Sequence, residues 1–231
     1  MRQIQPIRSK NELVYASLRA AIIHGELAPG SRLVIDELAN ELGVSQIPVR
    51  EALRQLEADG FVTSKPHVGA TVTDIQPSLI TEIFGLLEAM EIISGRAACE
   101  RLNEDDLRDL ERQLRHMDTL VNDPDGWSAA NVRFHQTICE RAGTPLVQKM
   151  MDKALAHWDR LRSYYHLKDV FAQRVAEAHQ EHWQMFEAIS RHDPDKVEQI
   201  ARAHNQAALA SYVNFLETEL VAENSSKRDM T

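Results

Sequence analysis

The stretch ELGVSQIPVREAL, residues 41–53, most constrains the fold, because it places a proline inside an otherwise strong helical pattern. Proline costs little only in the first turn of a helix, where backbone N–H groups have no intrahelical partner. Ser45 is a favourable N-cap, and Gly43 can adopt the positive φ that ends a preceding helix. With Ser45 as the N-cap, Pro48 becomes the third helical residue. The stretch therefore predicts two short helices joined by a tight turn.

The helix before this turn is IDELANEL, residues 35–42, whose apolar residues recur with helical spacing. The helix after it reads PVREALRQLEADG and ends at Gly60. Its core side carries three apolar residues, Val49, Leu53 and Leu56. A different face carries three polar residues, Gln46, Arg50 and Arg54. Gln pairs with adenine, and Arg pairs with guanine or with phosphate. Helices with this spacing can place the second helix in the major groove of DNA.

Two β-prone runs, 61–64 and 70–75, flank the turn KPHVG and predict a β-hairpin wing. A wing offers side chains and backbone groups to phosphates or to the minor groove. The alternative is a small helical domain with exposed arginines, and the wing directly after the second helix favours DNA binding. We expect DNA contacts from nine residues: Arg32, Ser45, Gln46, Pro48, Arg50, Arg54, Lys65, His67 and Gly69.

The remainder of the chain shows helical patterns and almost no strand signals. Six helices are expected, at 77–101, 104–122, 127–142, 145–167, 169–191 and 194–221. The predicted fold is mainly α, with a winged helix-turn-helix in residues 1–76, an all-α helical bundle in 77–222 and a frayed polar tail in 223–231. Residues 1–75 carry eight Lys and Arg against nine Asp and Glu, so the net charge of −9 lies mainly in the later part.

The location of the protein is expected to be the cytoplasm. No run approaches the roughly 18 apolar residues of a membrane helix, and the N-terminal MRQIQPIRSK shows no signal peptide pattern. Two cysteines, Cys99 and Cys139, do not form a disulfide framework. A reduced compartment is the simplest interpretation, and no membrane partner is expected.

Three histidines lie on the apolar stripes of three different predicted helices: His135, His182 and His204. Asn131 precedes His135 by one turn and shares its stripe. Three buried imidazoles without partners would be costly, and a shared divalent cation would satisfy them. Neutral imidazole suits Zn, Ni, Co or Mn. Two alternatives remain open, a purely structural cluster and a metal-dependent hydrolase, although no HExxH motif supports the latter.

The segments LRAAIIHGELAPGSRL, ELANELGVSQIPVREALRQLEADGFV and HVGATVTDI resemble the winged helix of the GntR family of bacterial transcription regulators. The helical remainder resembles the family's FadR-type ligand domain, known as FCD, in its shorter, VanR-like six-helix form. This resemblance implies a homodimeric DNA-binding regulator and not an enzyme. It also implies release from a palindromic operator by a small organic acid, which makes the protein a repressor.

The resemblance extends to individual residues of both predicted sites. NVRFH, EHWQMF and ARAHNQ match the family's metal-binding positions, which implies Asn131, His135, His182 and His204 as ligands of a divalent ion, with zinc favoured. Asn131 stands where Asp is usual. In such relatives the metal also binds a carboxylate effector, and Arg160 is expected to help hold it. At the DNA face, Gln46 and Asp36 stand where the family commonly has arginines that touch DNA.

Overall fold

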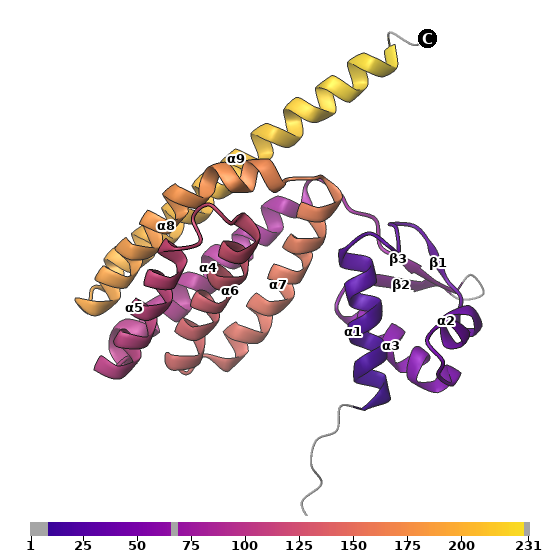
Figure 1. Cartoon of the computed structure of the whole chain (residues 1–231), viewed down its shortest axis with the longest axis horizontal. Helices are drawn as coiled ribbons and strands as arrows, with labels where there is room; N and C mark the ends of the chain where they lie inside the picture. The colour runs from indigo at the N-terminus through magenta and orange to yellow at the C-terminus, as the bar shows by residue number, and fades with distance from the viewer. Residues whose placement is uncertain (1–8, 66–68, 229–231) are drawn as a thin grey trace, which may run out of the picture. The chain divides into compact units, whose positions relative to one another are not determined.

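The computed structural model describes residues 9–65 and 69–228, without the side chains of Lys65, Lys168 and residues 219–228 (Figure 1). The chain forms two compact units. The first is Met1–Gln76 with Asp159–Tyr164, and the second is Pro77–Trp158 with Tyr165–Thr231. Most of the described residues are helical, and their strands form one three-stranded sheet, so the predicted mainly α fold is confirmed.

The first unit alternates short helices and strands. In chain order they are α1 (Lys10–Ile23), β1 (Arg32–Leu33), α2 (Ile35–Glu41), α3 (Gln46–Ala58), β2 (Val62–Lys65) and β3 (Gly69–Val72). The sheet is antiparallel in the order β1-β3-β2, and Thr63 pairs with Thr71 across β2 and β3. Helices α1 and α2 both pack against α3. This is the predicted helix–turn–helix followed by a hairpin wing.

Local signals in the sequence explain where α3 begins. Gly43 has a φ of 63°, a left-handed conformation that ends α2 and turns the chain. Ser45 occupies the N-cap position, but its side chain makes no capping hydrogen bond among the described residues. Pro48 is the third residue of α3, where its missing N–H leaves no intrahelical bond unmade. The helix then buries Val49 and Leu56 completely.

The second unit is built from six helices, as predicted. They are α4 (Leu79–Arg101), α5 (Glu104–Asp118), α6 (Pro124–Arg141), α7 (Pro145–Tyr164), α8 (Lys168–Ser190) and α9 (Pro194–Arg228). The end of α7 belongs to the first unit. Helix α6 begins earlier than expected, because Asp123 caps it and Pro124 is its first residue. The prediction of a frayed tail from residue 223 is wrong up to Arg228, since no glycine or proline interrupts α9.

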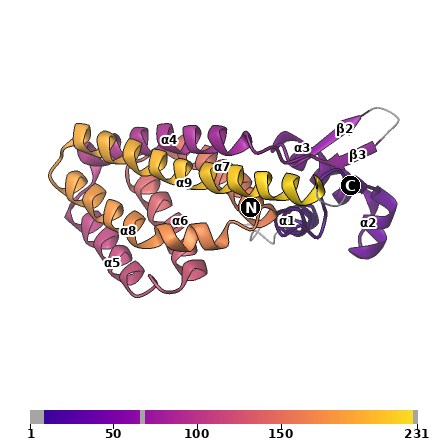
Figure 2. The same ribbon diagram turned by 90° about the horizontal axis from the view of Figure 1, so that it is seen from above.

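Helix α9 lies alongside both α4 and α8, as Figures 1 and 2 show. Helix α5 packs against α6 and α8, and α6 also touches α4. The interior of the unit contains large apolar side chains that are almost fully buried, among them Leu110, Leu114, Met117, Trp127 and Phe134. Helices α6, α8 and α9 thus share one core, and each presents its apolar stripe to it.

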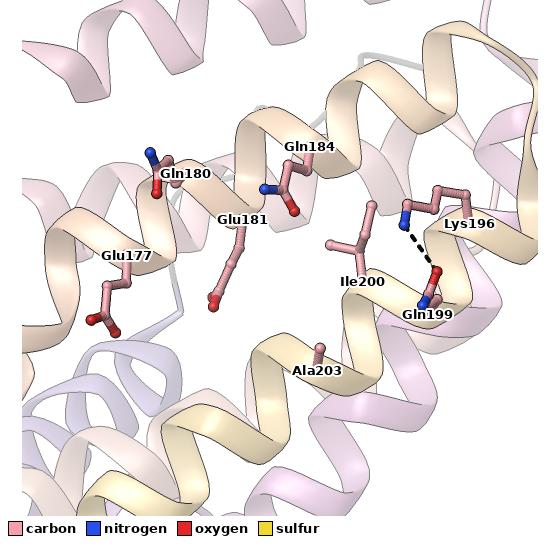
Figure 3. Close-up of a pocket in the computed structure, with 8 residues that line it drawn as sticks. All are labelled: Glu177, Gln180, Glu181, Gln184, Lys196, Gln199, Ile200 and Ala203. Atoms are coloured by element: carbon pink, nitrogen blue, oxygen red, sulfur yellow. Dashed lines mark hydrogen bonds between the residues drawn. The ribbon is translucent and has the colours of Figure 1, made fainter.

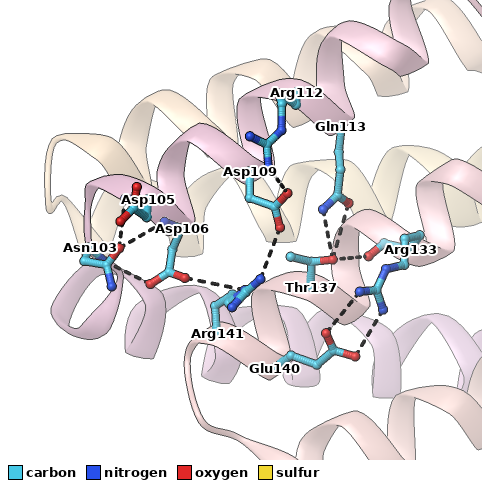
Figure 4. Close-up of polar contacts among 10 residues, drawn as sticks. All are labelled: Asn103, Asp105, Asp106, Asp109, Arg112, Gln113, Arg133, Thr137, Glu140 and Arg141. Atoms are coloured by element: carbon cyan, nitrogen blue, oxygen red, sulfur yellow. Dashed lines mark hydrogen bonds and ion pairs between the residues drawn. The ribbon is translucent and has the colours of Figure 1, made fainter.

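Polar contacts fix α6 against α5 around this core (Figure 4). Arg141 lies within 3.5 Å of both Asp106 and Asp109, and Gln113 donates to the Thr137 hydroxyl at 3.1 Å. Exposed ion pairs of this kind contribute little energy individually. Their effect is to set the position of α6 along α5, and α6 carries two of the residues predicted to hold a metal.

Candidate functional site

Three helices of the second unit bring His135, His182 and His204 to one point. Their candidate ligand atoms all lie within 4.8 Å of one another, and the Nε2 atoms of His135 and His182 are 3.1 Å apart. His182 has no exposed surface, and His135 is 6% exposed. The histidines come from α6, α8 and α9 respectively. The structure therefore brings together the three histidines that the sequence singles out.

Aromatic rings hold the cluster from the core side. The Trp127 ring stacks on His182 with centroids 5.6 Å apart and planes 24° apart. Phe134 lies 5.4 Å from the His182 ring and 5.5 Å from the His135 ring. Both aromatic residues belong to the apolar stripe of α6 that predicts a core-facing helix. The imidazoles are thus packed against rigid apolar groups and have little freedom to turn.

The buried environment favours the neutral form of His135 and His182. Burial lowers the pKa of His135, and burial together with repulsion from the neighbouring histidines lowers the pKa of His182 well below its usual value. Neutral imidazole is the form that binds metal ions. The Nε2 atoms of these two rings face each other at 3.1 Å, a separation that suits two ligands of one shared cation.

Carboxylates lie near the outer nitrogen of two of the histidines, and one of these contacts is a hydrogen bond. His204 Nδ1 lies 2.7 Å from Glu181 Oε2, and His135 Nδ1 lies 3.5 Å from Glu91 Oε1. A carboxylate at Nδ1 fixes the tautomer of the ring and leaves Nε2 free for a metal. Burial would raise the pKa of Glu181, but hydrogen bonds from His204 and Arg174 outweigh it, so the net shift is downward.

The sequence prediction missed both carboxylates. Glu91 is 6% exposed and lies on the buried face of α4, between Met90 and Ser94. A charged residue on an apolar stripe is the sequence signal that could have identified it. Its second oxygen accepts a hydrogen bond of 2.7 Å from Asn205. Glu181 gave no such signal. It points about 100° away from His182 on α8, and its partner His204 lies on another helix, α9.

Asn131 adds an oxygen to the same region of α6. Its Oδ1 is buried and has no hydrogen-bond partner in the described part of the chain. A buried carbonyl without a partner is costly, and such a group calls for an explanation. A metal ion bound by the three histidines would supply the missing partner. The three histidines therefore fit a divalent metal, and Asn131, one turn before His135 on α6, is a candidate for a neutral oxygen ligand.

An open groove between α8 and α9 is lined in part by Glu181, the hydrogen-bond partner of His204 (Figure 3). Its volume is about 380 Å³, which is within the usual range for small-molecule sites. Glu181 forms part of its wall, together with Glu177 and Lys196. Two carboxylates against one ammonium do not favour an anionic ligand. The groove exposes Glu181 to solvent, and it is not itself a carboxylate site.

Arg160, the residue predicted to bind an effector, belongs to the first unit. It is 3% exposed, donates to the Thr73 hydroxyl at 2.8 Å and also donates to the Thr73 carbonyl. Burial lowers the pKa of its guanidinium. These contacts assign Arg160 a structural role beside Thr73, and they give no support to the predicted effector contact.

The candidate DNA face lies on the first unit. Six of the predicted contact residues are exposed there: Arg32, Ser45, Gln46, Arg50, Arg54 and Gly69. Pro48 is buried, so the prediction that it contacts DNA is corrected, and its role is to shape the start of α3. Lys65 lies in β2 by its backbone, and its side chain is outside the described part. His67 lies outside the described residues.

Hydrogen bonds connect the exposed polar residues of α2 and α3. Gln46 donates through its amide nitrogen to Asp36, and its amide oxygen accepts from Arg50 at 3.0 Å. Arg54 lies 3.5 Å from Glu51 on the same helix. Asp36 and Gln46 are the two positions at which this chain departs from the arginines common in the family that it resembles.

Comparison with known proteins identifies both units. The FCD domain model matches residues 82–207, and the model of the bacterial regulatory proteins of the gntR family matches residues 10–72. The chain belongs to the GntR family and carries an FCD domain. It is a DNA-binding, ligand-responsive transcription regulator and not an enzyme. No helix in the described part of the chain has the length and apolar character that a membrane crossing requires.

Individual relatives agree with this assignment. The repressor RspR of Escherichia coli (strain K12) is 27% identical over 206 residues, covering 88% of this chain and 89% of its own. The galactonate operon transcriptional repressor of the same strain is 26% identical over 214 residues, covering 84% and 92%. The solved structure of E. coli McbR/YncC has the same fold, with a TM-score of 0.71 at 23% identity, covering 91% of this chain and all of its own.

Proposed function

We propose that this protein is a homodimeric repressor in the cytoplasm that senses a small carboxylate or sugar acid through a zinc ion in its FCD domain. The observation that carries the proposal is the convergence of His135, His182 and His204, and the buried, unpartnered oxygen of Asn131, one turn before His135, supports it. Zinc suits three imidazole nitrogens with open positions, and nickel, cobalt or manganese would suit the same ligands.

The carboxylates around the histidines support a doubly charged cation. Three neutral imidazoles and one amide would leave its charge of +2 uncompensated. Glu91 and Glu181 lie directly behind two of the imidazoles and supply negative charge without occupying a coordination position. They compensate for the absence of the Asp that is usual at the position of Asn131. The open positions of the ion therefore remain available to an anion.

A small organic acid is the class of effector that such a site favours. A carboxylate oxygen is an acceptable ligand for zinc and carries charge that a partly compensated cation attracts. A sugar acid is one candidate of this class, because one relative is named the galactonate operon transcriptional repressor. When bound, the metal would polarise and orient the carboxylate, and the protein would supply the surrounding shape.

The homodimer is proposed from the GntR family and from the surface of α4. Leu86 and Ile93 are 55% and 54% exposed and lie seven residues apart, on one face of that helix. Exposed apolar side chains that recur with helical spacing suit a partner helix. A two-fold dimer would present two copies of α3 to a palindromic operator.

The proposal is tested by thermal shift of the full-length protein with a panel of small carboxylates and sugar acids. Zinc-loaded and chelator-treated samples are compared, because ligand binding stabilises by about 2.7 kcal/mol at a hundred times the dissociation constant. We expect one class of acid to raise the melting temperature only when zinc is present. A shift of equal size without metal would contradict binding through the ion.

A matched pair of variants at Asn131 assigns the fourth ligand. Asn131→Asp restores a charged oxygen ligand, so zinc should bind more tightly, and Asn131→Ala removes the oxygen, so zinc should bind more weakly. Isothermal titration with zinc measures both. Identical affinities in the two variants would remove Asn131 from the ligand set, while His135 and His204 would stay in it.

The complete burial of His182 favours a second candidate, in which the metal is purely structural. In that case chelation would lower the melting temperature, and no acid would restore it or shift it further. Operator binding in the presence of the identified acid separates the two candidates. A sensing site predicts a change in operator affinity that disappears after chelation, and a structural site predicts none.

A further inference from the structure

The two departures from the family pattern on the DNA face touch each other. The Gln46 amide nitrogen donates to Asp36 Oδ1, and the Gln46 amide oxygen accepts from Arg50 Nη2 at 3.0 Å. Asp36 lies on α2, whereas Gln46 and Arg50 lie one turn apart on α3. All three side chains are exposed. They form a continuous chain of hydrogen bonds across the helix–turn–helix, called here the Asp36–Gln46–Arg50 chain.

The chemistry of the two end groups fixes the orientation of the amide between them. An ionised carboxylate only accepts hydrogen bonds, and a guanidinium only donates them. The Gln46 nitrogen must therefore face Asp36, and its oxygen must face Arg50. A rotated amide would place an oxygen against a carboxylate and an NH₂ group against a guanidinium, so both contacts would become repulsive. The orientation of Gln46 thus depends on Asp36 as much as on Arg50.

An amide held in this way keeps half of its hydrogen-bonding capacity. A primary amide has two N–H groups and two acceptor lone pairs, and the chain uses one of each. The remaining N–H and lone pair match the N7 acceptor and the N6 amino group that adenine presents in the major groove. Arg50 retains further N–H groups, which match the O6 and N7 acceptors of guanine.

We infer that Asp36 is a specificity-determining positioning residue of the DNA interface, which orders Gln46 and Arg50 so that they read an A·T pair and a nearby G·C pair as one unit. The inference rests on the proposed binding of DNA by this face. Asp36 touches no base in this role. It acts through Gln46, and its own negative charge opposes the approach of phosphates, so it lowers overall affinity for DNA while it sharpens the base preference.

Affinity and base preference are therefore separate readouts. The test is selection of full-length protein on duplex DNA with a randomised core, followed by sequencing of the enriched sites and titration of the best site. Wild type is compared with Asp36→Asn, Gln46→Ala and Arg50→Ala. Asn has the shape of Asp but donates as well as accepts, so it no longer fixes the amide of Gln46. Glu37→Gln is the control, because it removes an equal charge from the adjacent exposed position of α2.

We expect wild type to enrich a site with an A·T preference that Gln46→Ala abolishes and a G·C preference that Arg50→Ala abolishes. A bidentate base contact discriminates by roughly 5- to 150-fold. Asp36→Asn should reduce the A·T preference at least about 5-fold and weaken the G·C preference less, while affinity for unrelated DNA rises. Glu37→Gln should raise affinity for unrelated DNA similarly and keep the base preferences of wild type.

Two results would overturn the inference. If Asp36→Asn enriches the wild-type site with undiminished preferences while Gln46→Ala does not, Gln46 reads its base without help from Asp36. If wild type enriches no site, this face does not read sequence, and the role of Asp36 is rejected together with the proposed DNA contacts. Neither result bears on the metal centre, because no acid is present and its ligands are unchanged.

Discussion

The candidate metal centre and the candidate DNA face are both networks of polar side chains, but they differ in exposure to water. In the candidate metal centre, His135 and His182 are buried, and carboxylates lie 3.5 Å and 2.7 Å from the outer nitrogens of His135 and His204, respectively. On the DNA face, the Asp36–Gln46–Arg50 chain is exposed, so water competes for every bond. Hydrogen bonds are stronger in a low dielectric and more costly to leave unmade. The side chains of the buried centre are therefore held in place before a ligand binds. The exposed chain only favours certain side-chain conformations, which become fixed when DNA binds.

The largest expected effect comes from removing a buried ligand. His182→Ala should reduce zinc affinity by more than the roughly 10- to 100-fold that loss of an outer partner costs, and the thermal stabilisation by zinc should disappear. Zinc content after dialysis and melting temperature with and without zinc measure this. Binding of the metal-free protein to the selected DNA site should persist, because that face lies in the other unit.

His179→Ala is the matched control for this experiment. His179 is also buried on α8, one turn before His182, but its Nε2 lies 2.6 Å from Asp118 and outside the three-histidine cluster. The variant should lose stability and keep zinc. Retention of one zinc per chain by His182→Ala would show that the cluster is not the metal site.

The exposed face should respond to the loss of one base-reading side chain. Arg50→Ala is expected to weaken binding to the selected operator by about 1–3 kcal/mol and to leave the melting temperature nearly unchanged. Fluorescence anisotropy with the selected and a scrambled site measures the loss. Arg133→Ala, which removes an exposed ion pair with Glu140 in the second unit, is the control and should bind DNA as wild type does. Equal weakening on both DNA sites would assign Arg50 to phosphate and not to a base.

The contrast between the two regions also explains what could be predicted from sequence. Helical periodicity identifies the stripes of α6, α8 and α9, and histidines on apolar stripes must converge if the stripes share a core. This local reasoning finds His135, His182 and His204. It cannot find the carboxylate beside His204, because the meeting of Glu181 with His204 depends on how α8 and α9 pack. The contact of Arg160 with Thr73 could not be predicted for the same reason, since Thr73 is remote in sequence.

On the DNA face, periodicity separates the buried side of α3 from the exposed side that carries Gln46 and Arg50. The bond between Gln46 and Asp36 crosses from one helix to another, so spacing within a helix does not reveal it. Pro48 shows a further limit. Its place at the start of α3 follows from local rules, but its burial follows from packing in the first unit. Sequence reasoning therefore succeeds where the cause is local and fails where two elements must meet.

A smaller effect is expected from the outer carboxylate of the metal centre. Glu181→Gln keeps an oxygen that can accept from His204 but removes the negative charge, so zinc affinity should fall by about tenfold, at the lower end of outer-partner effects. Isothermal titration with zinc measures the loss. Glu177→Gln is the control, since Glu177 also pairs with Arg174 but has no contact with a histidine of the cluster among the interactions of the described residues. Equal losses in the two variants would point to Arg174, and not to the histidine contact, as the cause.

The smallest expected effect separates stability from DNA binding at the start of α3. An N-cap side chain that bonds the helix contributes about 1 kcal/mol, but Ser45 makes no such bond. Ser45→Ala should therefore change the free energy of unfolding by less than about 0.5 kcal/mol. Asn103→Ala is the comparison, because Asn103 accepts from two backbone N–H groups of α5 and should cost about 1 kcal/mol. Denaturant unfolding measures both variants.

The same Ser45→Ala variant should bind the selected operator more weakly, with a loss that is similar for specific and scrambled DNA, because a hydroxyl at the start of a helix suits phosphate. Helix N-termini attract phosphate through their unsatisfied N–H groups, and a free hydroxyl beside them adds one donor. If Ser45→Ala were as destabilising as Asn103→Ala while DNA binding stayed the same, the hydroxyl would act as a cap in solution. The polar groups of the exposed face would then be hydrogen-bonded within the protein, as those of the buried centre are.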